Sequence, residues 1–270
     1  MTNALTVGSL FAGIGGFDLG LERAGFEITW QVEIDPYCQR VLAKHWPHVQ
    51  RYGDIRAIDW GTVEPVDLLC GGFPCQDISL AGKGAGLAGE RSGLWFEYAK
   101  AIEVLRPSYV LIENVSALRS RGLDQVLGAL AALGYDAEWH CIPACAVGAP
   151  HRRDRVWILA YTGSTKSRRL SGSEREAIST PWCDGSNVAD TSQQQRDRWM
   201  HWTCGWEREP QEALRDARGR GREEAWMSIP ESLLGRVAHG IPHRVDRLRA
   251  LGNAVVPQIV ESIGRFILAD

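Results

Sequence analysis

Short apolar segments alternate with segments of helical spacing along the first 161 residues, and this alternation constrains the fold more than any other feature. Apolar strands are expected at residues 5–11, 28–35, 66–72, 108–115 and 155–161. Strands that alternate with helices form βαβ units, so the pattern predicts an α/β fold with a doubly wound, mostly parallel sheet. Ligands of such sheets bind at the carboxyl ends of the strands.

The character of the sequence changes after Tyr161. The stretch that follows is rich in Ser, Arg, Gln and Trp and has no long periodic pattern, whereas helical spacing returns near the C-terminus. We therefore expect one domain from residues 1–161 plus 246–270, and a small inserted lobe from residues 162–245. Residues 161–250 hold 15 of the 30 Lys and Arg residues, although the whole chain has a net charge of −3. This distribution favours a lobe that faces DNA.

Composition excludes several other classes of protein. No apolar run reaches the roughly 18 residues that a membrane helix needs, and the N-terminal residues lack the basic start of a signal peptide. The seven cysteines are an odd number without zinc-like spacing. Free thiols, no metal site and a cytoplasmic location are therefore expected.

The segment FAGIGGFDLG at residues 11–20 forms the first turn from strand to helix. Glycines there let a ligand approach the backbone and the helix N-terminus. Glu33 follows Gly13 by 20 residues, at a strand end where a carboxylate can accept hydrogen bonds from ribose hydroxyls. Asp54 in GDIR can accept a hydrogen bond from an adenine amino group. A purely structural turn and a nicotinamide or flavin site also fit, so the pattern indicates only a nucleoside-like ligand.

The segment GGFPCQDIS at residues 71–79 places Cys75 in a glycine-rich turn at the same sheet edge. Only the thiolate is a nucleophile, and a free cysteine with a pKa of about 8.5 is little ionised at neutral pH. Exposed backbone N–H groups in such a turn favour the thiolate. A buried cysteine with only a packing role describes Cys38 or Cys70 better, so the motif favours a nucleophile at Cys75.

Charged residues at the next two strands complete the candidate site. Glu113 ends an apolar strand, where a carboxylate is costly unless it binds a partner or substrate. Arg153 and Arg155 are expected to lie on the same side of the following strand and to bind an anion or carboxylate. Arginines that are merely solvated at the start of the strand also fit. A thiol nucleophile, a carboxylate and a nucleoside pocket together suit methylation of cytosine C5, a carbon that reacts only after thiolate addition at C6.

The ordered set FAGIGG, EID, GDIR, GGFPCQDIS, ENV, PHRRDR and GNAV resembles the DNA (cytosine-5)-methyltransferases of the short bacterial and phage type. The resemblance covers residues 5–161 and about 248–268. It implies a Rossmann-like, S-adenosylmethionine-dependent fold with an inserted target-recognition lobe. The implied activity is sequence-specific methylation of a flipped cytosine in duplex DNA through a covalent Cys75–C6 intermediate. It also implies a monomer that binds double-stranded DNA, with a restriction endonuclease as an optional partner.

The resemblance assigns roles position by position. Cys75 adds to C6, Glu113 contacts N3 and the exocyclic amine, Arg153 and Arg155 hold the flipped cytosine, its phosphate or the catalytic loop, and Asn114 positions that loop. The expected residues of the S-adenosylmethionine pocket are Phe11, Gly13, Ile14, Gly15, Gly16, Glu33, Ile34, Asp54, Ile55, Asn253 and Val255. The expected DNA contacts are Ser79, Arg196, Arg198, Arg215, Arg218, Arg220 and Arg222, most of them to phosphates.

Three departures from the family pattern and three other functions accompany this interpretation. One departure is that the recognition lobe, about residues 162–245, is short. His151 stands where the family usually has Gln, and the arginine-led helical motif that normally precedes GNAV is not apparent. A tRNA-methylating relative is one alternative, but the segment GGFPCQDIS does not support it. A catalytically silent DNA-binding relative is another, but such a protein has no need of an exposed thiol. A nicotinamide-dependent oxidoreductase leaves both GGFPCQDIS and GNAV without a role.

Overall fold

The computed structural model describes residues 4–74, 93–149, 151–163 and 244–269. The chain divides into two compact units. The first contains Met1–Ile142, Asp154–Leu170 and Val245–Asp270, and the second contains Pro143–Arg153 and Ser171–Arg244. The strands described below all belong to the first unit.

A seven-stranded sheet has the order β3-β2-β1-β4-β5-β7-β6. The first five strands in this order are parallel, and β7 pairs antiparallel with both β5 and β6. This confirms the predicted α/β fold with a mostly parallel sheet. The strands are β1 Thr6–Leu10, β2 Glu27–Val32, β3 Gln50–Tyr52, β4 Leu68–Gly71, β5 Tyr109–Val115, β6 Tyr135–Ile142 and β7 Arg155–Thr162.

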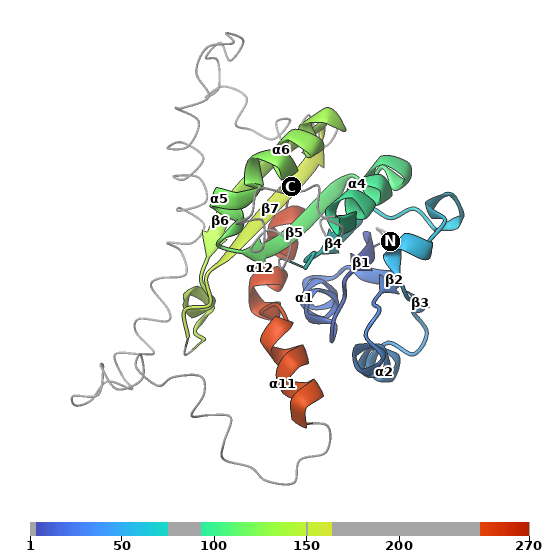
Figure 1. The fold of residues 1–270 in the computed structure, drawn as a ribbon, viewed down its shortest axis with the longest axis vertical. Coiled ribbons are helices and arrows are strands. Elements are labelled where there is room, and N and C mark those ends of the chain that lie inside the picture. The colour runs from blue at the N-terminus through green and yellow to red at the C-terminus, as the bar shows by residue number, and fades with distance from the viewer. Residues whose placement is uncertain (1–3, 75–92, 150, 164–243, 270) are drawn as a thin grey trace, which may run out of the picture. The chain divides into compact units, whose positions relative to one another are not determined.

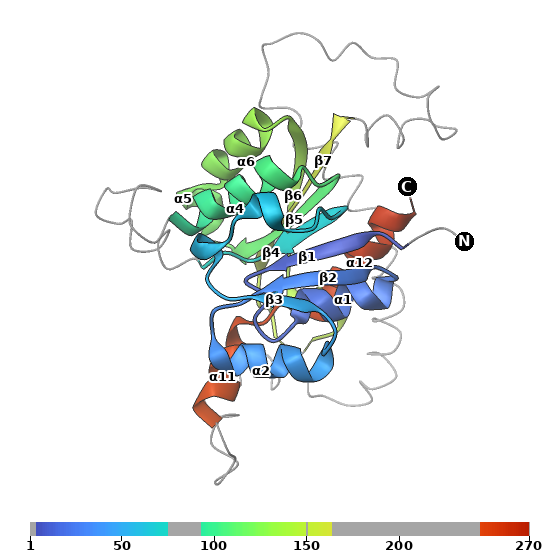
Figure 2. The same cartoon turned by 90° about the vertical axis from the view of Figure 1, so that its right-hand side faces the viewer.

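Helices cover both faces of the sheet. Figures 1 and 2 show α4, α5 and α6 on one face and α1, α2 and α12 on the other. The helices are α1 Gly16–Ala24, α2 Pro36–His45, α4 Gly93–Leu105, α5 Leu118–Arg121, α6 Leu123–Ala132, α11 Arg244–Asn253 and α12 Pro257–Leu268. Three short 3₁₀ helices are η1 Ile55–Ala57, η2 Trp60–Thr62 and η5 Ala144–Val147.

The central strands are apolar on both sides because helices cover both faces. Leu69 of β4 and Val110 of β5 are fully buried in the core beneath α4 and α6. On the opposite face α12 packs along α1, and their apolar side chains include Leu21 and Ile263, both inaccessible to solvent. The N-terminal and C-terminal segments of the first unit therefore lie side by side.

Several elements were not predicted, among them β6 and α11. Strand β6 is an edge strand in which only the two end residues, Tyr135 and Ile142, are buried, so it lacks the apolar run by which the other strands were recognised. Helix α11 carries few buried side chains, so its sequence shows little of the regular spacing of apolar residues that marks a helix. This helix occupies the position before GNAV where no helical motif was apparent in the sequence.

Of the second unit, the structure describes residues 143–149 and 151–153 together with Arg244, the first residue of α11. The backbone N–H of Ala144 donates to the carbonyl oxygen of Arg152 at 2.6 Å and closes this short segment. The predicted domain boundaries stay predictions, since residues 164–243 lie outside the described part of the chain. In that described part, no helix has the length and apolar character to cross a membrane.

Candidate active site

The turn after β1 has a left-handed backbone at alternate residues. Phe11, Gly13 and Gly15 have φ angles of 52°, 57° and 85°. Glycine adopts this conformation without a steric penalty, whereas an aromatic residue such as Phe11 is strained there. Gly15 is the N-cap of α1, and the turn points the backbone N–H of Gly13 toward β2. The turn is therefore shaped for backbone contacts.

Glu33 follows the end of β2 and is held by two backbone donors. The N–H of Gly13 donates to Oε2, and the N–H of Asp35 donates to Oε1, each at 2.7 Å. A carboxylate has about four acceptor positions, so both oxygens keep the capacity to accept a further hydrogen bond. This geometry can bind a pair of neighbouring hydroxyls.

Asp54 follows β3 and is held by Arg56. Its carboxylate accepts hydrogen bonds from the Nε and Nη2 groups of Arg56 at 2.6–3.1 Å and from the backbone N–H of Arg56 at 3.0 Å. Hydrogen bonds from the Arg56 guanidinium and backbone lower the pKa of Asp54 below its usual value. Asp54 is therefore a fixed, ionised acceptor at the solvent boundary.

A cavity of about 290 Å³ opens at the carboxyl ends of β1, β2 and β3. Ile34 is 61% exposed although it is a large aliphatic side chain. Beside two carboxylates, this exposed apolar surface suits a flat ring with polar edges. The cavity is lined by Phe11, Val32, Glu33, Ile34, Gly53, Asp54, Ile55, Arg56, Pro74, Gly93 and Leu94.

Five of the predicted cofactor residues line this cavity: Phe11, Glu33, Ile34, Asp54 and Ile55. Two predicted glycines instead permit close packing behind the turn. A Cβ atom on Gly15 would lie 2.4 Å from the Trp46 ring, and one on Gly16 would lie 2.7 Å from Cγ2 of Val255. The GNAV segment thus reaches the glycine turn. The described residues that line the cavity do not include Gly13, Ile14, Gly15, Gly16, Asn253 or Val255.

Glu113, near the end of β5, is buried and forms an ion pair with β7. Its Oε1 atom lies 2.9 Å from Nε of Arg155. Arg155 is the first residue of β7 and pairs with Val115 across the antiparallel ladder, so the sheet register brings the two side chains together. The guanidinium offsets part of the cost of burying a carboxylate at this position.

The chain that leaves β4 runs beside Glu113. A Cβ atom on Gly72 would lie 3.0 Å from Oε2 of Glu113, so only glycine allows this approach without a shift of that carboxylate. The amide of Asn114 donates to the carbonyl oxygen of Phe73 at 3.0 Å. The backbone immediately before Cys75 is therefore fixed against the end of β5.

The model of the family described as C-5 cytosine-specific DNA methylase matches residues 5–225, most of the chain. The chain belongs to this family. Its ordered motifs are those on which the sequence resemblance was based, and the family assignment made from them is confirmed.

Curated relatives of this chain are bacterial Type II methyltransferases. M2.BsuMI of Bacillus subtilis (strain 168) is 38% identical over 164 residues, which are 58% of this chain and 42% of the relative. M.Eco47II of Escherichia coli is 38% identical over 167 residues, 58% of this chain and 40% of the relative. M.HhaI of Haemophilus parahaemolyticus is 33% identical over 156 residues, 56% of this chain and 47% of the relative. The chain spans less than half the length of these relatives.

Solved structures agree with this assignment. A protein encoded within an Escherichia coli prophage, provisionally named a DNA modification methyltransferase, matches with a TM-score of 0.51 and 26% identity over 64% of this chain and 50% of its own. The Entamoeba histolytica methyltransferase EhMeth matches with a TM-score of 0.50 and 18% identity, over 59% of this chain and 53% of its own. The latter similarity concerns the fold alone.

One geometric expectation for the candidate site is wrong. Arg153 and Arg155 do not alternate along one strand, because β7 begins at Arg155 and Arg153 has a left-handed φ of 39° before it. Arg153 also belongs to the second compact unit. Cys75 and the predicted DNA contacts lie outside the described residues; those contacts are Ser79, Arg196, Arg198, Arg215, Arg218, Arg220 and Arg222.

Several residues that line the cavity were not predicted. Arg56 stands within the quoted motif GDIR, and a cation two residues after a loop carboxylate is a signal for a local ion pair. Pro74 and Leu94 flank the segment between β4 and α4, and the rule that strand ends and following helices meet at one sheet edge could have identified them. Val32 and Gly53 carry no comparable signal.

Proposed function

We propose that this protein is a sequence-specific DNA (cytosine-5)-methyltransferase that uses S-adenosylmethionine and a covalent Cys75–C6 intermediate. The observation that carries the proposal is the buried Glu113–Arg155 ion pair beside the backbone that leads into Cys75. The ion pair and the backbone before Cys75 lie at the sheet edge that also contains the Glu33 cavity. Nucleophile, carboxylate and nucleoside pocket are the three parts that methylation at C5 requires.

The cavity suits the adenosine part of S-adenosylmethionine. Glu33 has acceptor capacity on both oxygens for the ribose hydroxyls, and the exposed Ile34 side chain offers an apolar surface for the adenine ring. Asp54 is a fixed acceptor for the adenine amino group. When bound, the cofactor supplies an electrophilic methyl group on a sulfonium sulfur. Asn253 and Val255 are proposed to complete the pocket from the C-terminal side.

The chain's own residues make cytosine reactive. The Cys75 thiolate forms a bond to C6, and the electrons of the C5–C6 double bond move toward C5, which becomes nucleophilic. Glu113 contacts N3 and the exocyclic amine, and Arg155 fixes the orientation of that carboxylate. After methylation, water removes the C5 proton, the double bond re-forms and the thiolate leaves. Arg153 is proposed to hold the flipped base, its phosphate or the catalytic loop.

The substrate is proposed to be duplex DNA, from which the target cytosine must be flipped at a cost of a few kcal/mol. Residues 162–245 form the proposed target-recognition lobe, with arginines that contact phosphates or bases. Ser79 contacts the DNA backbone. We further propose a cytoplasmic monomer that acts beside a restriction endonuclease or as a phage enzyme without one.

Expression in a host without cytosine methylation tests the proposal. Base-resolution mapping of the host DNA should find 5-methylcytosine at one recurrent sequence, and the Cys75→Ser variant should give none. In the presence of S-adenosylmethionine, duplex DNA with 5-fluorocytosine at that target should form a covalent adduct with the wild-type protein, because fluorine at C5 blocks the elimination that follows methyl transfer. Absence of both modified cytosine and adduct would contradict the proposed activity.

A further inference from the structure

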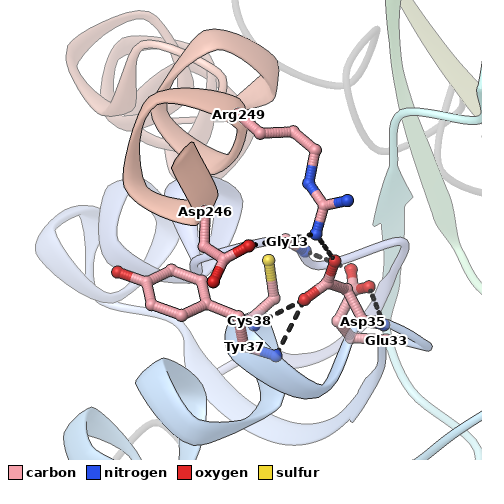
Figure 3. Close-up of polar contacts among 7 residues, drawn as sticks. All are labelled: Gly13, Glu33, Asp35, Tyr37, Cys38, Asp246 and Arg249. Carbon is pink, nitrogen blue, oxygen red and sulfur yellow. Dashed lines mark hydrogen bonds and ion pairs between the residues drawn. The ribbon is translucent and has the colours of Figure 1, made fainter. Parts of the chain in front are cut away.

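Helix α11 is attached to the wall of the cofactor cavity by an ion pair. The Nη2 group of Arg249 donates to Oδ2 of Asp35, a residue 214 positions earlier in the chain (Figure 3). Both residues belong to the first compact unit. The contact therefore joins the segment that leads into GNAV to the loop that carries Glu33.

Asp35 transmits this contact to Glu33. Its Oδ1 atom accepts the backbone N–H groups of Tyr37 and Cys38 at 2.8 and 3.2 Å and so caps α2. Its own backbone N–H donates to Oε1 of Glu33. The two carboxylate oxygens of Asp35 thus bind different groups. Oδ1 accepts hydrogen bonds from the first turn of α2, and Oδ2 pairs with Arg249. A shift of Asp35 would move one of the two donors that orient Glu33.

Helix α11 has little apolar attachment of its own. Val245, Leu248 and Leu251 are 79%, 52% and 62% exposed, and Ala250 is the single buried side chain among residues 245–253. Polar contacts must therefore supply a large share of what fixes its position. The helix leads through residue 254 to Val255, which packs on Gly16 of the glycine turn.

The charged side chains around Arg249 also indicate that its guanidinium helps to hold α11 in place. Asp246, one turn earlier on α11, lies 3.8 Å from Nη2 of Arg249, so this guanidinium stands between two carboxylates (Figure 3). Burial, followed by the charges of Glu33 and Asp35, raises the pKa of Cys38 to about 12, while Arg249 opposes the rise. Loss of Arg249 would leave Asp35 and Asp246 facing each other without a cation between them.

We propose that Arg249 is a positioning residue of the cofactor site, which acts through Asp35 to fix Glu33 and holds α11 against the cavity. The inference rests on the proposed function, in which Glu33 binds the cofactor ribose. It assigns to α11 a role in cofactor affinity, whereas methyl transfer itself is left to Cys75 and Glu113.

Calorimetry of S-adenosylmethionine binding to the full-length protein tests this role. Arg249→Ala should raise Kd by roughly twofold to fivefold, which is the range expected of a partly exposed ion pair. Arg249→Lys should recover part of the affinity. Asp35→Asn should weaken binding similarly, although Asn still caps α2. The double variant should be no weaker than either single variant, because both remove the same interaction.

Matched controls separate this role from a general loss of charge or fold. Arg265→Ala removes an arginine of α12 that pairs with Glu261 at 2.7 Å within its own helix, and Glu261→Gln weakens the same pair from the other side. Both should keep the wild-type Kd. In methylation assays Arg249→Ala should raise KM for S-adenosylmethionine and leave kcat within about twofold, and the rise should shrink in high salt.

A second measurement needs no cofactor. Amide hydrogen exchange of residues 245–253 should be faster in Arg249→Ala than in Arg265→Ala. Unchanged exchange, or equal Kd values for these two variants, would overturn the inference while the proposed function stands. If the wild-type protein itself does not bind S-adenosylmethionine, the proposed function fails, and the exchange result still decides whether Arg249 holds α11.

Discussion

The side-chain amide of Asn114 connects the end of β5 to the chain that leads into Cys75. Its Nδ2 group donates to the Phe73 carbonyl oxygen at 3.0 Å, and its Oδ1 atom accepts the backbone N–H of Val115 at 2.9 Å. The residue is 2% exposed, so water cannot replace either partner. Asn114 therefore fixes the two residues before Cys75 relative to Glu113.

Replacement of Asn114 by Ala should impair catalysis more than cofactor binding. The Phe73 carbonyl would lose a buried donor, which costs about 1–3 kcal/mol and loosens the approach to the nucleophile. We expect single-turnover methylation to slow by about tenfold or more, while Kd for S-adenosylmethionine stays within about twofold. Asn114→Asp keeps the acceptor for Val115 but places an oxygen against the Phe73 carbonyl, so full activity of that variant would contradict this role.

Glu113→Gln should nearly abolish methylation with little change in fold. The amide keeps the shape of the side chain, but it cannot compensate the Arg155 guanidinium or a positive charge that develops on cytosine. Loss of a general acid–base group lowers rates by about 10²- to 10⁴-fold. Glu138→Gln, which replaces a carboxylate of β6 bonded to the Tyr161 hydroxyl, is the matched control. Comparable rates for the two variants would remove Glu113 from the reaction.

The sequence predicted the parts of this molecule that depend on local pattern. Buried parallel strands are continuous apolar runs, so β1, β4 and β5 were recognisable, and the charge at the end of β5 identified Glu113 because a carboxylate there needs a partner. Glu33 was identified by its spacing from Gly13, and Asp54 by the motif GDIR. No coordinates were needed for these steps.

Other features depend on tertiary contacts that no local pattern encodes. The Asp35–Arg249 pair joins residues 214 positions apart, and its arginine lies on a helix with weak apolar spacing. Alternation along a strand predicted a shared side for Arg153 and Arg155, but the left-handed backbone at Arg153 interrupts that period before β7 begins. Edge strand β6 was missed because it lacks the continuous apolar run that marks the buried strands.

The buried carboxyl of Asp18 should make stability depend on pH. It accepts hydrogen bonds from Gln31 at 2.8 Å and Ser9 at 3.1 Å, but burial dominates and raises its pKa from 3.8 to about 6. Between about pH 4 and pH 6 the folded state binds more protons at this site than the unfolded state. The contribution of Asp18 to the free energy of unfolding therefore falls as pH rises through that range.

Asp18→Asn removes this dependence. Above pH 6 the variant should be more stable than the wild type, by on the order of 3 kcal/mol at most, because it avoids a buried charge. Gln31 Oε1 has no hydrogen-bond partner in the described structure and could accept from the new amide after a side-chain flip. Chemical denaturation at pH 5 and pH 8 measures the effect, with exposed Glu22→Gln on the same helix as the control. An equal difference at both pH values would rule out Asp18 as its source.

Gly16→Ala should both destabilise the protein and weaken cofactor binding. The added Cβ would lie 2.7 Å from Cγ2 and 3.0 Å from the carbonyl oxygen of Val255, so the C-terminal segment must move. Overpacking of this kind costs about 1–3 kcal/mol. Gly128→Ala in α6, where no atom lies within 4 Å of the new Cβ, should instead raise stability by about 0.5–1 kcal/mol through helix propensity. Urea denaturation of the two variants measures both changes in the free energy of unfolding. A Gly16→Ala protein as stable as the Gly128→Ala protein would mean that Val255 does not pack on the glycine turn.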